Sequence, residues 1–239
     1  GMAALDLLKA LTTSYKDKIR FGMTLFPDKD GMECTQGSIP VPVGTGKEAK
    51  IQSVLTAALK TDDALYPSGP CVTNIDTAMD QARGEPAFAD QSRQGFALLV
   101  TDGQQAGCSA AGGDAGTVNI ITDLRSKKGV RTYVIGFGSG VDAKQLDAFA
   151  AAGGTTSFYK AEDQASLDKA LTTIAASTLG CDFQLKQSPP NSQEIFVFFD
   201  KKTRVTRDAS HKNGWDYNEA QNRVTFYGMA CDSLRAGTV

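Results

Sequence analysis

The sequence predicts an α/β fold, in which a mostly parallel β-sheet is flanked by helices and followed by a small β-rich appendage. Short apolar stretches alternate with amphipathic helical stretches over residues 14–177, a rhythm typical of parallel sheets with helices on both faces. The rhythm stops near Gly180, and residues 181–239 show no helical period. We therefore expect two domains, residues 1–179 and residues 180–239.

Local patterns justify the elements of the first half. Leu5, Leu8 and Leu11 have helical spacing. The turn signal "PDKDG" ends a first strand, and two prolines restrict the next strand to a sheet edge, so a hairpin is the simplest connection between the two. In chain order we expect a helix over residues 3–15, strands over 18–26 and 38–43, helices over 47–60 and 73–83, and a strand over 97–101.

Residues 114–177 continue the alternation of strands and helices, and the residues after Gly180 are predicted to be β-rich. Gly129 stands where a helix C-cap is expected, and Asp163 is a plausible N-cap. We expect a helix over residues 114–129, a strand over 130–138, a helix over 142–154, a short strand over 156–161 and a helix over 163–177. In the appendage we expect a hairpin of residues 194–200 and 203–208 and a further strand over 222–231.

Composition excludes several classes of protein. The net charge of the 239-residue chain is -2, so no footprint for nucleic acid or for an anionic membrane is expected. No stretch reaches the roughly 18 consecutive apolar residues that span a bilayer. The opening residues lack the basic and apolar regions of a signal peptide.

Five cysteines are scattered through the chain without a C-x-x-C pair, which disfavours a zinc ribbon or a thioredoxin-type motif. Single cysteines at loop-like positions favour disulfides and an oxidising compartment, although five reduced thiols remain the alternative. Cys181 and Cys231 bracket the appendage, where closing a loop of about 50 residues stabilises by roughly 3–4 kcal/mol. Among the other three, both a Cys71–Cys108 and a Cys34–Cys108 pairing are open.

Two oxygen-bearing residues are candidates for a cation site. Asp102 directly follows the predicted strand 97–101, where an Asp-Gly pair is also a common turn. Thr73 precedes a predicted helix, where it also suits an N-cap. Ligands gather at the carboxyl ends of strands in such sheets, so we expect both residues on one rim. Their hard oxygens suit Mg²⁺, Mn²⁺ or Ca²⁺, but two ligands are too few for firm binding.

Three segments in this order, "VTNIDTAM", "LLVTDG" and "TYVIGFGSGVDAKQLDAFAAAGG", resemble the von Willebrand factor type A domain over residues 3–177. The resemblance implies a Rossmann-like sheet with a metal-ion-dependent adhesion site on its carboxyl rim. That site takes ligands from a D-x-S-x-S loop, a Thr and an Asp, to which Thr73 and Asp102 correspond. The resemblance also implies that Asp102 acts through water, and that an open position on the ion accepts a carboxylate from a partner protein.

The beginning of the sequence departs from this family pattern. No D-x-S-x-S precedes the first helix, and the family's first strand, which lies in the middle of the sheet, is missing. A central parallel strand is paired on both edges, so we expect a non-standard sheet centre or a swapped strand, and a homodimer through the incomplete sheet becomes an option. Truncation, another segment in the slot and a second chain are open explanations. We expect weak or no ion binding by this chain.

The appendage carries a weaker resemblance of its own. "GCDFQL", "GWDY" and "ACDSL" look like the Cys-containing β-extension that follows this domain in secreted proteins of some Gram-negative bacteria. The resemblance implies a periplasmic, cell-surface or secreted protein.

Other motifs favour structural roles. "GFGSG" follows a late strand and is more typical of a turn than of a dinucleotide site. His211, the only histidine, lies in a polar loop and is expected to be solvated. Trp215 and Tyr217 are either an exposed contact patch or, as we favour, local core of the appendage.

The sequence therefore favours a non-enzymatic adhesion or protein-interaction module that binds a protein ligand through the loops of Thr73 and Asp102. A metal-dependent hydrolase using Asp102 is an alternative, which requires further carboxylates to converge on the rim. The nearest in sequence are Asp28, Asp30, Asp76 and Asp114. A structural module whose metal site has decayed is the third option.

Overall fold

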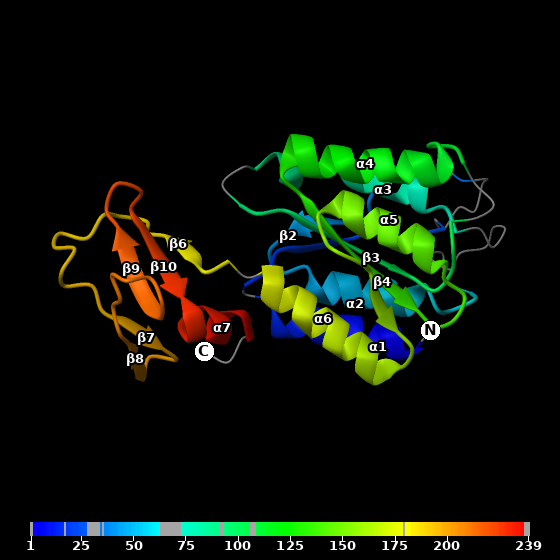
Figure 1. Cartoon of the computed structure of the whole chain (residues 1–239). Helices are drawn as coiled ribbons and strands as arrows, with labels where there is room; N and C mark the ends of the chain where they lie inside the picture. The colour runs from blue at the N-terminus through cyan, green and yellow to red at the C-terminus, as the bar shows by residue number, and fades with distance from the viewer. Residues whose placement is uncertain are drawn as a thin grey trace. The chain divides into compact units, whose positions relative to one another are not determined.

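The computed structural model describes residues 2–16, 18–27, 34, 36–62, 73–90, 93–105, 109–178 and 180–236, and Figure 1 shows the whole chain. The chain divides into two compact units, Gly1–Leu171 and Thr172–Val239. This division falls inside a helix, whereas the domain boundary expected after residue 179 lies further along the chain and stays a prediction.

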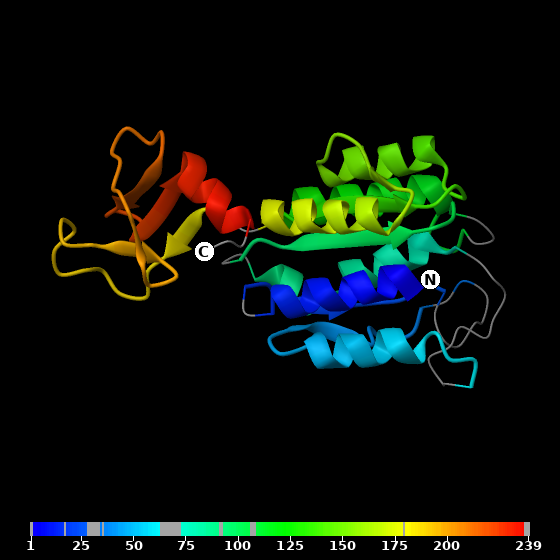
Figure 2. The same ribbon diagram turned by 90° about the horizontal axis from the view of Figure 1, so that it is seen from below.

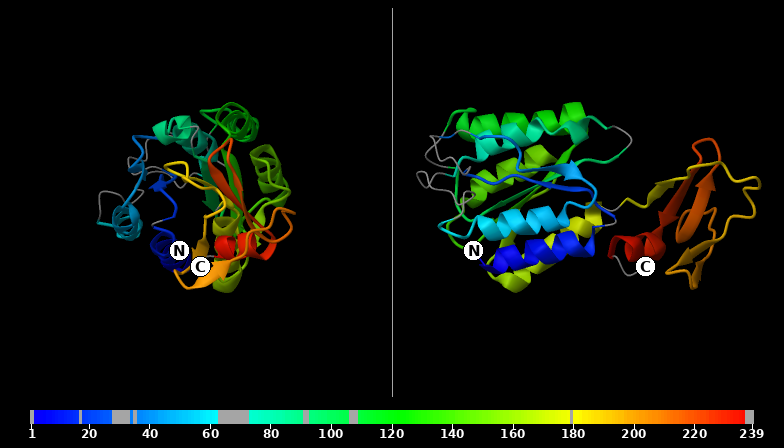
Figure 3. Two further views of the ribbon diagram at one scale, coloured as in Figure 1. Left: turned by 90° about the vertical axis from the view of Figure 1, so that its left-hand side faces the viewer. Right: turned by 180° about the vertical axis from the view of Figure 1, so that it is seen from behind.

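The first unit is the expected α/β domain. Its elements are α1 (Met2–Ser14), β1 (Phe21–Met23), β2 (Val41–Gly44), α2 (Glu48–Ala57), α3 (Ile75–Arg83), the 3-10 helix η1 (Pro86–Ala89), β3 (Phe96–Thr101), α4 (Gly113–Lys128), β4 (Arg131–Phe137), α5 (Ala143–Gly153), β5 (Tyr159–Ala161) and α6 (Gln164–Thr178). Strands β3, β4 and β5 form a parallel sheet in that order. Helices lie on both sides of β3 and β4 (Figures 1 and 3).

The main core forms where α3, α4 and α5 pack on β3 and β4. Strand β4 is buried from Thr132 to Gly136, as expected for a strand covered on both faces. The predicted helix ends are confirmed. Gly129 takes the left-handed conformation at φ +67° after α4, and Asp163 Oδ1 accepts the Ser166 N–H at 2.8 Å before α6.

The sheet is divided at its centre. Strands β1 and β2 pair antiparallel, as the expected hairpin, but they form a separate two-stranded sheet. Their own small core contains Val41, Ile51, Val54 and Leu55. Among the described strands, β3 pairs only with β4. Within the described residues the two sheets thus share no ladder, and the expected non-standard sheet centre stays a prediction.

The second unit is β-rich, as expected, but it also contains a helix that the sequence pattern did not predict. Its elements are β6 (Asp182–Gln184), β7 (Val197–Phe199), β8 (Thr203–Val205), β9 (Gly214–Asn218), β10 (Arg223–Tyr227) and α7 (Gly228–Ala236). Strand β10 pairs antiparallel with both β6 and β9. The hairpin of β7 and β8 is confirmed.

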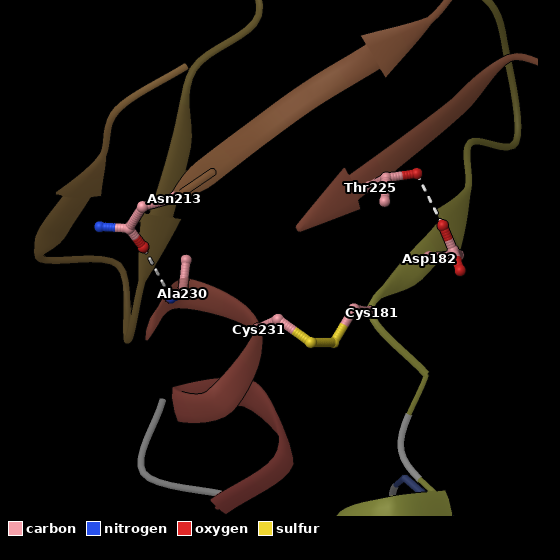
Figure 4. Close-up of a disulfide and its surroundings, with 6 residues drawn as sticks. All are labelled: Cys181, Asp182, Asn213, Thr225, Ala230 and Cys231. Carbon is pink, nitrogen blue, oxygen red and sulfur yellow. Dashed lines mark hydrogen bonds between the residues drawn. A yellow bond between two sulfur atoms is a disulfide. The ribbon is translucent and has the colours of Figure 1, made fainter. Parts of the chain in front are cut away.

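The prediction of one strand over residues 222–231 is wrong for residues 228–231, because strand β10 ends at Tyr227. Gly228 ends the strand with a φ of +54°, a conformation that glycine adopts without strain. The Asn213 side-chain oxygen then accepts the Ala230 N–H at 3.3 Å in the first turn of α7 (Figure 4). Ala230, Cys231 and Leu234 turn one apolar stripe of the helix toward the core of this unit, which stabilises a helix instead of a longer strand.

The core of the second unit is small and cross-linked. Trp215, the only tryptophan in the chain, is 2% exposed and Tyr217 is 7% exposed, so both serve as local core. The expected disulfide between Cys181 and Cys231 is present, with Cα atoms 5.4 Å apart, and it joins the chain just before β6 to α7 (Figure 4). A core of this size depends strongly on such a cross-link.

Removing this cross-link with the double variant Cys181→Ser/Cys231→Ser is expected to lower the unfolding free energy of the second unit by about 3–4 kcal/mol, because the unfolded chain regains loop entropy. Urea unfolding followed by the emission of Trp215 measures the change. Cys34 is also disulfide-bonded. The double variant leaves that bond intact, whereas chemical reduction would break both bonds. An unchanged urea midpoint would contradict the prediction.

Candidate functional site

The structure brings the loops of Thr73 and Asp102 together. Asp102 and Gly103 directly follow β3, and Thr73 lies two residues before α3. A Cβ placed on Gly103 would lie 3.2 Å from Thr73 Oγ1, so the Thr73 hydroxyl packs against the Asp102–Gly103 turn. Asp102 is exposed and Thr73 is half-buried. The loops of the two candidate ligands thus meet at the carboxyl end of β3, while a metal-binding role for Thr73 and Asp102 stays a prediction.

Thr101, and not Asp102, holds the turn after β3. The Thr101 hydroxyl donates to Gly103 O at 2.8 Å and accepts the Gly103 N–H at 3.3 Å. Thr101 is only 5% exposed, so this local pairing is protected from water. No described residue donates a hydrogen bond to the Asp102 carboxylate. Asp102 was expected either to form the turn or to act as a ligand. Because Thr101 holds the turn, the carboxylate of Asp102 is available for a ligand.

The loop after β4 closes the other side of Asp102. A Cβ on Gly140 would lie 2.7 Å from Asp102 O, a separation that side chains do not tolerate. Gly138, in the same loop, has a φ of +79°. The "GFGSG" run is therefore the turn at the end of a strand, as expected, and its glycines allow it to approach the backbone at Asp102.

The buried carboxylate of Asp76 organises the elements behind this rim. Asp76 is 0% exposed. Its Oδ2 accepts the Ala111 and Gly113 N–H groups at 3.0 and 2.9 Å, and its Oδ1 accepts the Thr77 N–H and Gln105 Nε2 at 2.8 and 3.2 Å. The first turn of α3 is thereby tied to the first turn of α4 and to the loop after β3.

Gln105 extends this connection to α5. The side-chain oxygen of Gln105 accepts the backbone N–H of Asp76 at 2.8 Å. The backbone N–H of Gln105 donates to Gln145 Oε1 at 2.8 Å. Gln145 Nε2 in turn donates to Asp114 Oδ1 at 2.9 Å. A surface hollow of about 420 Å³ between α4 and α5 is lined by Asp114, Gln145 and Phe149 among others. One continuous network thus fixes the starts of three helices around the rim.

These contacts decide which carboxylates are available for hydrolytic chemistry. Asp76 is saturated by four donors, and Asp114 is engaged by Gln145. Asp28 and Asp30 fall outside the described residues. Within the described ranges, no three histidine, cysteine or acidic side chains form a group that could hold a metal ion.

His211 belongs to a local cluster in the second unit. Its ring stacks on Tyr227 with centroids 4.5 Å apart, and its Nε2 lies 2.9 Å from Asp216 Oδ2. Arg207 Nε donates to the other oxygen of Asp216 at 2.8 Å. Burial raises the pKa of Asp216, but hydrogen bonds from His211 and Arg207 outweigh it and hold the pKa below the ordinary value. The cluster joins the loop before β9 to β9 itself.

The cysteines expected on the rim are only partly described. Cys34 is disulfide-bonded. Cys71 and Cys108 fall outside the described residues, so the Cys71–Cys108 and Cys34–Cys108 pairings are not distinguished.

Sequence reasoning missed the residues that hold the rim together. Asp76, the second residue of α3, reads as an ordinary acid in a first helical turn, where the helix dipole favours it. Gln105 and Gln145 carry no motif. Asn74, which is 1% exposed, has a side-chain oxygen without a hydrogen-bond donor among the described residues. Their roles depend on contacts between segments far apart in the chain.

The fold belongs to a class of α/β domains in which a sheet of parallel strands has helices on both faces and functional loops follow the carboxyl ends of the strands. The profile of the von Willebrand factor type A domain matches residues 3–173, which is more than half of the chain. The protein therefore belongs to the von Willebrand factor type A family, whose members are typically adhesion or protein-interaction modules. The family predicted from three short segments is confirmed.

Solved structures of a mussel protein share this fold. Proximal thread matrix protein 1 from the mussel byssus, in one crystal form, is 18% identical with a TM-score of 0.51, over 77% of this chain and 45% of that chain. A second structure of it, with a zinc-occupied MIDAS motif, is 15% identical with a TM-score of 0.51 and the same coverage. This chain thus spans less than half of their length. None of the curated proteins compared with the chain matches it.

The Asp76→Ala variant is expected to lose roughly 3–5 kcal/mol of unfolding free energy, because four hydrogen-bond donors lose a buried, charged acceptor. Urea unfolding followed by far-ultraviolet circular dichroism measures the loss. Asp114→Ala is the matched control, since this acid is exposed and a change within about 0.5 kcal/mol is expected. Equal losses for the two variants would show that the buried network does not carry the stability.

Proposed function

We propose that this protein is a non-enzymatic adhesion or protein-interaction module, whose contact with a protein ligand forms through a divalent cation at Thr73 and Asp102. The observation that carries the proposal is the contact of the Thr73 hydroxyl with the Asp102–Gly103 turn, beside a carboxylate that no described residue engages. In this arrangement, a carboxylate of the partner completes the coordination of the ion.

The donor set decides which ions fit. Hydroxyl and carboxylate oxygens are hard ligands that suit Mg²⁺, Mn²⁺ or Ca²⁺. Two protein oxygens leave most coordination positions to water and to the partner, and the sequence offers no D-x-S-x-S loop. The residues present therefore fit a weak, water-rich site. Zinc is a further candidate, because a mussel protein with this fold has been solved with a zinc-occupied MIDAS motif.

The disulfide bonds of the chain are consistent with a secreted protein. Disulfides persist in oxidising compartments, and the chain contains the bond between Cys181 and Cys231. The mussel proteins with this fold come from the byssus. We place the protein in the periplasm, on the cell surface or outside the cell, as a bacterial secreted type. In the described part of the chain, no helix is long and apolar enough to cross a membrane.

The cation site can be tested with Mn²⁺ alone, by the loss of the electron paramagnetic resonance signal of the free ion on binding. We expect a Kd of the order of 10⁻⁴–10⁻³ M, as for weak extracellular cation modules. Asp102→Asn removes the only charged ligand and is expected to abolish binding. Asp114→Asn keeps the fold and leaves binding unchanged, since Asp114 is bound to Gln145. Micromolar affinity of the unaltered chain would mean that an additional ligand had been overlooked.

The interaction function can be tested on a surface that presents carboxylates. On carboxymethylated dextran, the protein is expected to be retained with millimolar Mn²⁺, released by EDTA, and not retained on plain dextran. Asp102→Asn is expected to abolish retention and Asp114→Asn to preserve it. Retention that persists after EDTA is added would overturn the proposal. Binding of Mn²⁺ without retention on the surface would favour a structural module with a decayed site.

A further inference from the structure

We propose that a basic end of the first unit, made up of Arg93, Arg125, Lys127, Lys128 and Arg131, docks on an anionic lipid surface by contact with the lipid phosphates. The net charge of -2 of the whole chain averages over this cluster and does not reveal it. The inference goes beyond the cation-dependent contact and does not depend on it. The basic end lies where the parallel strands begin, whereas the candidate cation site lies where they end.

The topology of the sheet gathers the basic residues at one end. Strands β3 and β4 are parallel, and the helices of this unit run along them (Figures 1 and 2). A helix that connects parallel strands runs back to the edge where the next strand begins, so α4 ends beside the start of β4, and its last turn is basic. Arg131 is the first residue of β4. Its N–H donates to Gly95 O at 3.3 Å, which places it beside the loop of Arg93.

Contacts between three helix ends hold this surface together. Lys128 Nζ donates to Arg83 O at 2.6 Å, at the end of α3. A Cβ placed on Gly154, just after α5, would lie 2.8 Å from Arg125 Nε, so the guanidinium of Arg125 lies against the end of α5. The basic end is therefore one surface, formed by the ends of α3, α4 and α5 and by the start of β4.

The positive charge of this surface is only partly neutralised. The nearby acids include Asp123, whose Oδ2 lies 2.9 Å from Lys127 Nζ, and Asp90, whose backbone oxygen accepts the Arg93 N–H at 3.3 Å. The three arginines of the basic end are exposed, and none of them forms an ion pair with a residue that the structure describes. A guanidinium is permanently charged, and its donors match the geometry of a phosphate group.

The helix dipole explains only part of this cluster. Basic residues in the last turn of a helix are favoured by the negative end of its dipole, which accounts for the three basic residues at the end of α4. Arg93 lies in a loop and Arg131 lies in a strand, so the dipole of α4 does not require either of them. These two arginines extend the positive surface beyond the helix and indicate an external anion.

The composition of the surface favours a lipid partner over other anionic partners. In the described ranges, none of the large exposed hydrophobic side chains lies on the segments that form the basic end. Protein interfaces depend on aromatic and apolar anchors, and single-stranded nucleic acids stack on aromatic rings. An anionic lipid surface needs neither, because it attracts basic residues through charge alone. Its array of phosphates can contact several arginines of one end together.

Docking in this way orients the domain. The amino ends of β3 and β4 face the lipid, so the carboxyl ends of the same strands point away from it. Asp102, which is exposed after β3, then remains accessible to a protein ligand in solution or on another surface.

The test uses the full chain and vesicles of phosphatidylcholine, with and without an equal amount of phosphatidylglycerol, in EDTA. We expect co-sedimentation with the anionic vesicles only, weakened about tenfold or more between about 0.05 M and about 0.3 M NaCl, because salt screens the charges. Amide hydrogen exchange in the complex is expected to slow over residues 93–96 and 125–131, and to stay unchanged around Thr73 and Asp102.

The triple variant Arg93→Gln/Arg125→Gln/Arg131→Gln is expected to weaken vesicle binding about 100-fold, since each basic residue near an anionic surface strengthens binding about fivefold. These side chains are exposed, so the fold is expected to persist, which circular dichroism checks. If the triple variant folds poorly, Arg125→Gln alone is expected to weaken binding about fivefold.

The matched control is Lys50→Gln/Lys60→Gln/Lys144→Gln, which removes the same charge from exposed positions elsewhere on the first unit. It is expected to change vesicle binding by no more than about twofold, because a surface charge acts within about one Debye length. Asp102→Asn is expected to bind vesicles like the unaltered chain, so failure of the cation site and failure of the basic end are separate results.

Four results would overturn the proposal. Neutral and anionic vesicles bind the chain equally well, or the arginine variant and the lysine control weaken binding equally, or exchange slows around Thr73 and Asp102 instead of at the basic end. Tighter binding to duplex DNA than to anionic vesicles at the same phosphate concentration would also overturn it, since the surface would then prefer a nucleic acid.

Discussion

The carboxylate of Asp76 is the interaction on which the candidate site depends. It is fully buried and accepts four hydrogen bonds, and these come from α3, from the start of α4 and from Gln105 after β3. A buried charge is stable only when hydrogen bonds satisfy it in this way. The loop of Thr73 and the loop of Asp102 belong to segments that this one group holds together, so the rim is a consequence of the core beneath it.

Two acids near the rim, Asp76 and Asp102, have different roles in the structure. Asp76 supplies rigidity, and its saturated oxygens take no part in ligand binding. Asp102 is exposed, while Thr101 holds the turn beside it, so the carboxylate of Asp102 is not needed for the fold. Of Asp76, Asp102 and Asp114, only Asp102 therefore has a carboxylate that no described residue engages.

Much of the fold could be predicted from the sequence, because it depends on local periodicity. Leucine spacing, the prolines of residues 38–43 and the apolar run before Asp102 each indicated the correct element. Helix α7 was missed, since its stripe of Ala230, Cys231 and Leu234 is short and its first turn depends on Asn213, which is remote in the sequence. Thr73 and Asp102 could be brought to one rim by topology, whereas the roles of Asp76 and Gln105 arise only from long-range hydrogen bonds.

The disulfide of the second unit has a mechanical consequence for a chain placed under tension. Tension that enters before Cys181 and leaves after Cys231 passes through the covalent bond between their sulfur atoms, because the two residues close a loop with a sequence separation of 50. Strands β6 to β10 then carry almost none of the force. The second unit therefore behaves as an inextensible spacer, and a pull on the chain reaches the α/β domain without first unravelling its neighbour.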